Sequence, residues 1–420
     1  MTLASALTLP AHGVGGATDL PVPLTYAVVG AAWALTVSFA VLALAWKQPR
    51  LQNPVPAADE PARRPWLAVL GALLAAWFLG ALYLGPDETA NPGIGALYVL
   101  VWVGLVPLAL LAGHVWKDLS PWRSVQALVG RVSGRPEGFV VYPERLGHWP
   151  AAAGLLAFVW LELASPEPGS IEAVRLWVGL YVFVTVVAGV VFGPRWFDRG
   201  DPFDVYSALV ARLSPLVVAR RWRPHDPLRT LAATPVRPGL IAVVAVLLGS
   251  TAFDSFSSSP GWQGAPRSTA LTSAVLVLFC AVVASAFVLA ARATGGVSAE
   301  RRRALPGSLV HTLVPIVVGY IFAHYLSYLL ERGQQVLFGL VQLLGVGDSL
   351  QVAYVLSDRP ELLAGLKIGF VVAGHVVAVV AAHDRALAEL PRSHRLTGQL
   401  AMLVLMVGYT FAGIYLLLSV

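Results

Sequence analysis

The chain has 420 residues, of which 57% are hydrophobic and only 12% are charged, and its formal net charge is +6. These values exclude an ordinary soluble domain and predict an all-α polytopic membrane protein. The basic excess does not indicate binding to nucleic acid, because most of the arginines fall in particular loops between apolar segments.

Ten apolar segments are long enough to cross a hydrocarbon core of about 30 Å. In chain order they cover residues 24–46, 66–84, 95–116, 149–165, 172–193, 239–257, 270–291, 307–331, 364–383 and 397–419. The loops on one side carry 24 Lys and Arg residues, and those on the other side carry 5. The positive-inside rule therefore predicts that both termini face outward. We expect an external tail at 1–23, one transmembrane helical domain at 24–420, and a re-entrant or interfacial piece within the external segment 332–363.

The first half of the chain contains an internal repeat. The segments PWRSVQALVGR (121–131) and PFDVYSALVAR (202–212) have the same length and share proline, an aromatic residue, Ala-Leu-Val and arginine. Ser120 and Asp201 directly precede the two prolines, as an N-cap precedes a proline in the first turn of a helix. Both segments are therefore predicted to be short helices.

Each short helix follows a predicted pair of spans, which gives two copies of one unit at about 64–131 and 147–212. We expect each unit to be a helical hairpin followed by an amphipathic helix on the cytoplasmic surface, with Trp122 and Phe203 as interfacial anchors. Repeated hairpins occur in transporters and in other membrane proteins, so the repeat predicts a fold without selecting a function.

The predicted spans between 307 and 384 carry most of the polar groups that a lipid environment disfavours. These groups are His311, Tyr320, His324, His375, His383 and Asp384. An ionisable side chain inside a span is costly unless it faces the bundle interior, a water-filled cavity or a ligand. Each of them is therefore a candidate functional residue.

Depth along the helices separates these residues into two groups. With a rise of about 1.5 Å per residue, His324 lies about 25 Å above Gly307, in the outer half of the membrane. If Lys367 marks the outer interface, His375 lies about 12 Å below it, at a depth similar to that of His324. His383 lies about 12 Å lower still. An inner polar group is expected to contain His311, His383, Asp384 and His114.

Two acids join the outer group, because Glu162 and Asp254 fall near the outer ends of their spans. Two histidines with one or two carboxylates can hold a zinc-like divalent ion and activate a bound water molecule. This reading makes His324, His375 and Asp254 metal ligands. Asp254 is then a ligand or a general base. Glu162 is either a group that supports a metal ligand or an acid, and Tyr320, one turn below His324, is a further catalytic candidate. The same groups without a metal can pass protons, because histidine titrates in the physiological range.

Seven stretches resemble, in order and over nearly the whole chain, bacterial multipass proteins named fenitrothion hydrolase. They are HGVGGATDLPVP, NPGIGALYVLVWVGLV, GHVWKDLSPWR, STAFDSFSSSPGW, AHYLSYLLERGQ, GHVVAVVAAHDRAL and QLAMLVLMVGYT. The resemblance implies a hydrolase in the bacterial cytoplasmic membrane that splits a phosphotriester between phosphorus and an aryl leaving group. It carries over no catalytic residues.

We therefore expect a metal-dependent membrane hydrolase whose partners are the lipid bilayer and a small apolar molecule or an ion. A proton- or metal-ion-coupled transporter remains an alternative, because the repeat and the Asp, Glu and His residues also suit an ion path. A scaffold subunit of a membrane complex is a third reading, in which the histidines are structural.

Overall fold

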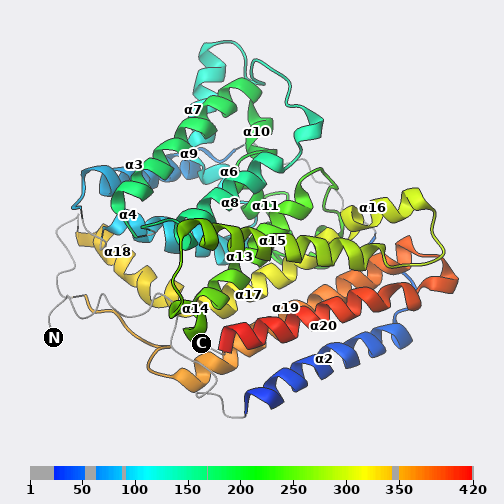
Figure 1. Cartoon of the computed structure of the whole chain (residues 1–420). Helices are drawn as coiled ribbons and strands as arrows, with labels where there is room; N and C mark the ends of the chain where they lie inside the picture. Colours follow the sequence, from blue (N-terminus) through cyan, green and yellow to red (C-terminus); the bar gives the residue numbers. More distant parts are fainter. Residues whose placement is uncertain (1–22, 53–62, 88–90, 168, 343–349, 419–420) are drawn as a thin grey trace.

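The computed structural model is almost entirely helical (Figure 1). It describes residues 23–52, 63–87, 91–167, 169–342 and 350–418. The tail predicted at 1–23 falls outside these residues except for its last position, and so does the middle of the predicted external piece at 332–363.

Within the described residues, nine helical segments are long and apolar enough to cross a membrane. They are α2 (Leu24–Ala45), α3 (Pro65–Leu84), Glu144–Leu163 with α8 (Trp149–Leu163), α9 (Ile171–Phe192), α13 (Leu240–Ser257), α15 (Thr269–Arg292), Ala299–Gly339, α19 (Pro360–Glu389), and Thr397–Leu418 with α20 (Leu400–Leu418). A tenth span results if Pro92–Val103 and Leu105–Ala112, which meet at a 44° bend, are taken together. The all-α multipass prediction therefore agrees with the structure.

Two of the spans contain a π-helical stretch. The bent span consists of α4 (Pro92–Gly95), η2 (Ala96–Val103), which is π-helical, and α5 (Leu105–Ala112). The long segment that starts at Ala299 consists of α16 (Ala299–Leu309), η4 (Val310–Leu313), α17 (Val314–Ser327), the π-helical η5 (Tyr328–Arg332) and α18 (Gly333–Gln342). The two π-helical stretches contact each other. Such breaks in helical geometry are frequent at functional sites.

Helix α17 lies at the centre of the bundle, where it packs against α13 and α19, and all but two of its fourteen residues are buried. Glycines allow α17 and α19 to approach closely. A Cβ atom on Gly319 would lie 2.5 Å from the carbonyl oxygen of Phe370, and one on Gly374 would lie 2.7 Å from that of Pro315. Small residues at such positions are typical of helix packing in membranes.

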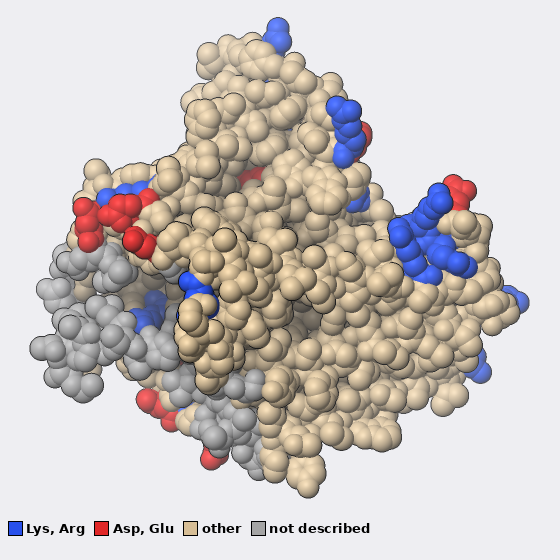
Figure 2. Space-filling model, viewed as in Figure 1, with Lys and Arg blue, Asp and Glu red and all other residues tan. Residues whose placement is uncertain are grey.

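Helices α2, α19 and α20 contact one another and lie side by side at the lower right of Figure 1. Most of the surface in Figure 2 carries no charge, and the charged side chains gather near its margins. One basic group lies over α16, where Arg301, Arg302 and Arg303 are exposed. A broad uncharged surface with charges at its ends is the pattern expected of a lipid-facing bundle.

The two repeated short helices have different environments. The first, α7 (Pro121–Val132), keeps an exposed apolar face that includes Leu128 and Val132, as a helix at a membrane interface requires. The second, α11 (Pro202–Ala211), has nine of its ten residues buried, and Phe203 is only 1% exposed. Phe203 packs against Phe158 of α8, so our prediction of an interfacial anchor is wrong there. A helix that is apolar on nearly all sides is buried by its neighbours.

The predicted caps also differ. Asp201 accepts hydrogen bonds from the backbone N–H groups of Phe203 and Asp204 and so caps α11, whereas Ser120 makes no side-chain cap at α7. The remaining short elements are α6 (Trp116–Leu119), η3 (Glu144–Leu146), α10 (Pro194–Arg199), β1 (Val217–Val218) paired antiparallel with β2 (Arg221–Trp222), α12 (Pro227–Ala232), α14 (Pro260–Gln263), η6 (Arg392–His394) and η7 (Thr397–Gln399).

Candidate functional site

The structure joins two of the sequence candidates, Asp254 and His324, in a buried hydrogen bond. Asp254 lies three residues before the end of α13, and its side chain is fully buried. Its Oδ2 atom is 3.0 Å from Nε2 of His324 and accepts a 2.6 Å hydrogen bond from the hydroxyl of Tyr325. Both partners belong to the last turn of α17. The carboxylate is therefore held by two adjacent residues of the central helix.

Ser255 completes this arrangement, and the sequence did not single it out. Its Oγ atom lies 3.3 Å from Nδ1 of His324, so each imidazole nitrogen has a side-chain partner on α13. Ser255 is buried. Its only signal in the sequence is that it follows Asp254, and the nearby serines at 257, 258 and 259 obscure this signal. We call Asp254, Ser255, His324 and Tyr325 the α13–α17 cluster.

Glu162, near the end of α8, lies beside this cluster. Its carboxylate is close enough to that of Asp254 for the two groups to interact electrostatically. The Oε2 atom of Glu162 is buried and has no hydrogen-bond partner among the described residues. A buried carboxyl oxygen without a partner is costly in its charged form. This position suits a proton donor or acceptor.

His375 and Tyr320 make their contacts elsewhere. His375 is fully buried, and its Nδ1 atom lies 2.9 Å from the carbonyl oxygen of Val371 in its own helix. Its ring packs edge-on against Tyr320, with 6.2 Å between the ring centroids. The hydroxyl of Tyr320 donates a 3.4 Å hydrogen bond to the carbonyl oxygen of Tyr409.

The predicted metal site was His324, His375 and Asp254. Among the described residues, no three or more His, Cys, Asp or Glu side chains are grouped so that they can hold a metal ion. The ligand set therefore stays a prediction, of which the structure brings Asp254 and His324 together while His375 contacts Val371 and Tyr320. The divalent ion remains a prediction of the sequence.

An apolar cavity of about 260 Å³ lies between α13, α15, α17 and α20. Leu248 and Ala252 of α13 and Tyr320 of α17 line it, and Leu278 and Val282 of α15 lie at its rim, 57% and 55% exposed. The cavity therefore reaches the outer surface of the bundle.

Helical spacing relates this cavity to the α13–α17 cluster. Residues three or four apart share one face of a helix. Ser255 follows Ala252 by three residues, and His324 follows Tyr320 by four. The contact between Ser255 and His324 therefore lies about one turn, roughly 5 Å, beyond the lining of the cavity.

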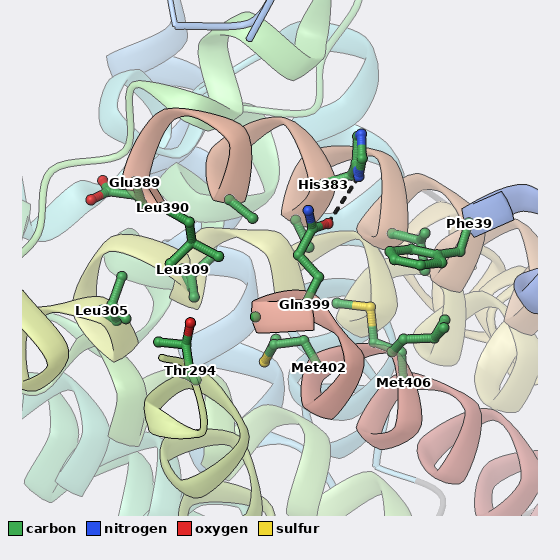
Figure 3. Close-up of a pocket in the computed structure, with 16 residues that line it drawn as sticks. Phe39, Thr294, Leu305, Leu309, His383, Glu389, Leu390, Gln399, Met402 and Met406 are labelled. Carbon is green, nitrogen blue, oxygen red and sulfur yellow. Dashed lines mark hydrogen bonds between the residues drawn. The ribbon is translucent and has the colours of Figure 1, made fainter. Parts of the chain in front are cut away.

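The predicted inner group does not form a single network. His383 contacts Oε1 of Gln399 and the carbonyl oxygen of Trp46, each at 2.9 Å. It also lines a cavity of only about 30 Å³, shown in Figure 3 with Met402 and Met406. Asp384 accepts hydrogen bonds from several groups in residues 46–52. Both residues therefore anchor the segment after α2.

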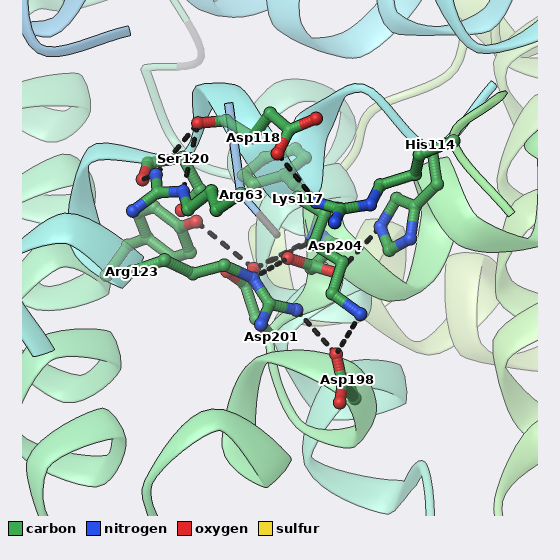
Figure 4. A network of polar contacts seen from close by, with 12 residues as sticks. Arg63, His114, Lys117, Asp118, Ser120, Arg123, Asp198, Asp201 and Asp204 are labelled. Atoms are coloured by element: carbon green, nitrogen blue, oxygen red, sulfur yellow. Dashed lines mark hydrogen bonds and ion pairs between the residues drawn. The ribbon is translucent and has the colours of Figure 1, made fainter. Parts of the chain in front are cut away.

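The other two inner candidates lie in separate surroundings. His311 is buried in η4, and its Nε2 atom has no hydrogen-bond partner among the described residues. His114 contacts Asp204 of α11, with 2.9 Å between Nε2 and Oδ1. His114 thereby joins the charged network in Figure 4.

That network connects equivalent positions of the two repeats. Arg123 is the third residue of the segment 121–131, and Asp204 is the third residue of the matching segment 202–212. The two side chains form a buried ion pair with 2.8 Å between Nε and Oδ2. This ion pair links α7 to α11. The sequence predicted the repeat but not this pairing. Arg123 also pairs with Asp198 at 2.7 Å (Figure 4). Arg220 pairs with Asp118 at 2.6 Å.

Two carboxyls of this network have perturbed pKa values. Burial acts to raise the pKa of Asp204, but Arg123 and His114 outweigh it and hold that pKa below its ordinary value. Burial, and next the charge of Asp204, raise the pKa of Asp201 to about 7.

Comparison of the chain with family models, curated proteins and solved structures gives no match. The function is therefore inferred from the residues and their geometry.

Proposed function

We propose that the chain is a membrane-embedded hydrolase of a small, apolar, phosphotriester-like ester. The observation that carries the proposal is the position of His324 between Ser255 and Asp254, with one ring nitrogen facing each side chain. A hydroxyl, an imidazole and a carboxylate linked in this order are the groups of nucleophilic hydrolysis. The 3.3 Å separation of Ser255 and His324 is loose, as such contacts often are before substrate binds.

The geometry supports the following sequence of steps. His324 takes the proton of Ser255 while Oγ attacks phosphorus, and the bond from phosphorus to the aryl oxygen breaks. Asp254 stabilises the resulting imidazolium, and Tyr325 holds Asp254 in place. The imidazolium passes its proton to the departing aryl oxygen and becomes neutral again. His324 then deprotonates a water molecule, which attacks phosphorus and breaks the bond between phosphorus and Oγ, and the proton returns from His324 to Ser255. Asp254 lies about 5 Å from the end of α13, which places the cluster near the membrane boundary and its water.

The apolar cavity supports the choice of substrate class. Its volume of about 260 Å³ is close to the lower end of small-molecule sites, which begin near 300 Å³. Its lining is almost wholly apolar, and Leu278 and Val282 open it to the face that lipid covers. An aryl group can therefore reach the cluster from the bilayer. We further propose that both termini face outward from a bacterial cytoplasmic membrane, which places the cluster in the outer half.

A chromogenic aryl dialkyl phosphotriester tests the proposal. We expect the purified protein in lipid nanodiscs to release the phenolate, and Ser255→Ala and His324→Gln each to lower the rate at least about 10³-fold. Ser250→Ala is the matched control, because Ser250 is a buried serine of the same helix whose hydroxyl donates to the backbone carbonyl of Leu247 and makes no other side-chain hydrogen bond within the described residues. Full activity in Ser255→Ala would refute the mechanism.

Proton-coupled transport is a second candidate, and the carboxyl of Glu162 beside Asp254 favours it. Two neighbouring acids and a histidine inside a bundle can relay protons. The Ser255→Ala variant separates the two functions, because a relay through Asp254 and His324 retains its titrating groups in that variant. Proteoliposomes with a pH-sensitive dye inside would then show proton flux that survives Ser255→Ala and is lost in Asp254→Asn.

A further inference from the structure

A second sizeable cavity lies where α13 begins, at the arginine-rich end of the bundle, and the proposed hydrolysis does not use it. Its volume is about 320 Å³, and its lining is mostly apolar. The residues around it come from the starts of α8 and α13, from α15 and from the α16–η4 junction, and include Trp149, Arg237, Leu240, Ala284, Gly307 and Val310. Ala284 and Gly307 are small residues, which leaves the cavity open between the helices.

Arg237 lies at this cavity, and the two acids whose charge acts on it, Asp198 and Glu144, form ion pairs with other arginines. Arg237 takes part in none of the ion pairs that the described residues form. Burial, and next the nearby Arg199, lower the pKa of Arg237. Arg195 and Arg199 already share Glu144, at 3.7 and 2.7 Å. The neighbourhood therefore carries more positive than negative charge.

The backbone fixes Arg237 at the mouth of the cavity. The N–H of His148 donates a 2.7 Å hydrogen bond to the carbonyl oxygen of Pro238. Gly239 has φ +82°, and a Cβ atom there would lie 2.4 Å from the backbone nitrogen of Trp149. This close turn places Arg237 near Trp149, which is 55% exposed. An exposed tryptophan beside an arginine is typical of the headgroup level of a membrane.

We propose that this cavity binds an anionic phospholipid, with the phosphate at Arg237 and one acyl chain between α13, α15 and α16. Charge complementarity supports a lipid phosphate, since arginine readily pairs with phosphate oxygens. The apolar depth of the cavity suits a chain, which free phosphate lacks. A zwitterionic lipid is less favourable, because the cation of its headgroup would lie near the positive charges of Arg199 and Arg195.

Native mass spectrometry of the detergent-solubilised full chain tests the site with added phosphatidylglycerol, phosphatidylcholine or inorganic phosphate. We expect phosphatidylglycerol to bind in preference to phosphatidylcholine, and excess inorganic phosphate to leave it bound. Arg237→Gln should weaken phosphatidylglycerol binding about fivefold, the effect of one interfacial arginine. Arg221→Gln, which removes an exposed arginine of β2, is the matched control and should bind as the wild type does.

Ala284→Leu provides an independent test, because it fills the cavity and keeps Arg237. We expect this variant also to lose phosphatidylglycerol, even if Arg237→Gln fails to fold. Equal binding of both lipids, displacement by inorganic phosphate, or unchanged phosphatidylglycerol binding in Ala284→Leu would each overturn the proposal. None of these readouts depends on hydrolytic activity.

Discussion

Replacing Arg123 by alanine should destabilise the protein strongly, because it removes the arginine that neutralises the buried carboxylate of Asp204. The Arg123 side chain is 7% exposed and that of Asp204 is 0% exposed. After the substitution, Asp204 retains, within the described part of the chain, the side-chain contact with His114. Removing one member of a buried ion pair costs about 3–5 kcal/mol. The pair with Asp198, whose side chain is 40% exposed, adds about 1 kcal/mol at most.

Unfolding in mixed micelles by increasing SDS, followed by tryptophan fluorescence, measures this loss. We expect Arg123→Ala to lower the free energy of unfolding by about 3–5 kcal/mol. Arg131→Ala, on the exposed face of the same helix, should change it by less than about 0.5 kcal/mol. The double variant Arg123→Ala/Asp204→Asn should recover at least about 1 kcal/mol, because it also removes the isolated charge. Equal losses in Arg123→Ala and Arg131→Ala would refute the reasoning.

Three further predictions concern other parts of the molecule. The pKa of Asp201 is raised from 3.8 to about 7, so the stability of the fold should fall as pH rises between these two values. Asp201→Asn, which can still cap α11, should reduce that fall when thermal unfolding is measured from pH 4.5 to 7.5. Gly413→Ala should displace Tyr320, whose hydroxyl would lie 0.9 Å from the new Cβ. We expect a lower melting temperature and a lower hydrolysis rate. An unchanged rate would show that the apolar cavity lined by Tyr320 is not the substrate path. His375→Gln should leave the hydrolysis rate unchanged, because the proposed mechanism does not use His375. If elemental analysis finds a stoichiometric metal in the wild type, and this variant loses both the metal and the activity, the predicted metal site would be supported instead.

The sequence predicts the spans well because bilayer thickness imposes a length on every apolar segment. The described helices begin and end within a few residues of most of the predicted limits. The largest difference is at the segment that starts at Ala299, where α16 extends the eighth span by eight residues on the arginine-rich side. This extension contains three arginines, which a hydropathy criterion assigns to a loop.

For the candidate site, the sequence predicted only how deep each residue lies in the membrane. The rise per residue placed His324 and His375 at similar levels, but it does not give the direction in which each side chain points. His324 contacts α13, while His375 faces Tyr320. Ser255 was missed because no spacing rule links it to a residue 69 positions away. Its role becomes visible only when α13 and α17 are packed together.

The repeat illustrates the same limit. Shared letters predicted that α7 and α11 are copies, but they carry no information about the third position, where the two segments differ. In the fold, these positions are Arg123 and Asp204, which bind each other. Phe203 was misjudged for a related reason, since the local pattern does not tell whether lipid or protein covers an apolar helix face.

Covalent trapping tests the central claim most directly. The purified protein is incubated with an apolar fluorophosphonate, and the labelled peptide is identified by mass spectrometry. The proposed mechanism predicts one phosphonyl group on Ser255, formed in the wild type and in Ser250→Ala and abolished in His324→Gln. A protein that hydrolyses the chromogenic triester yet carries no label on Ser255 would contradict it.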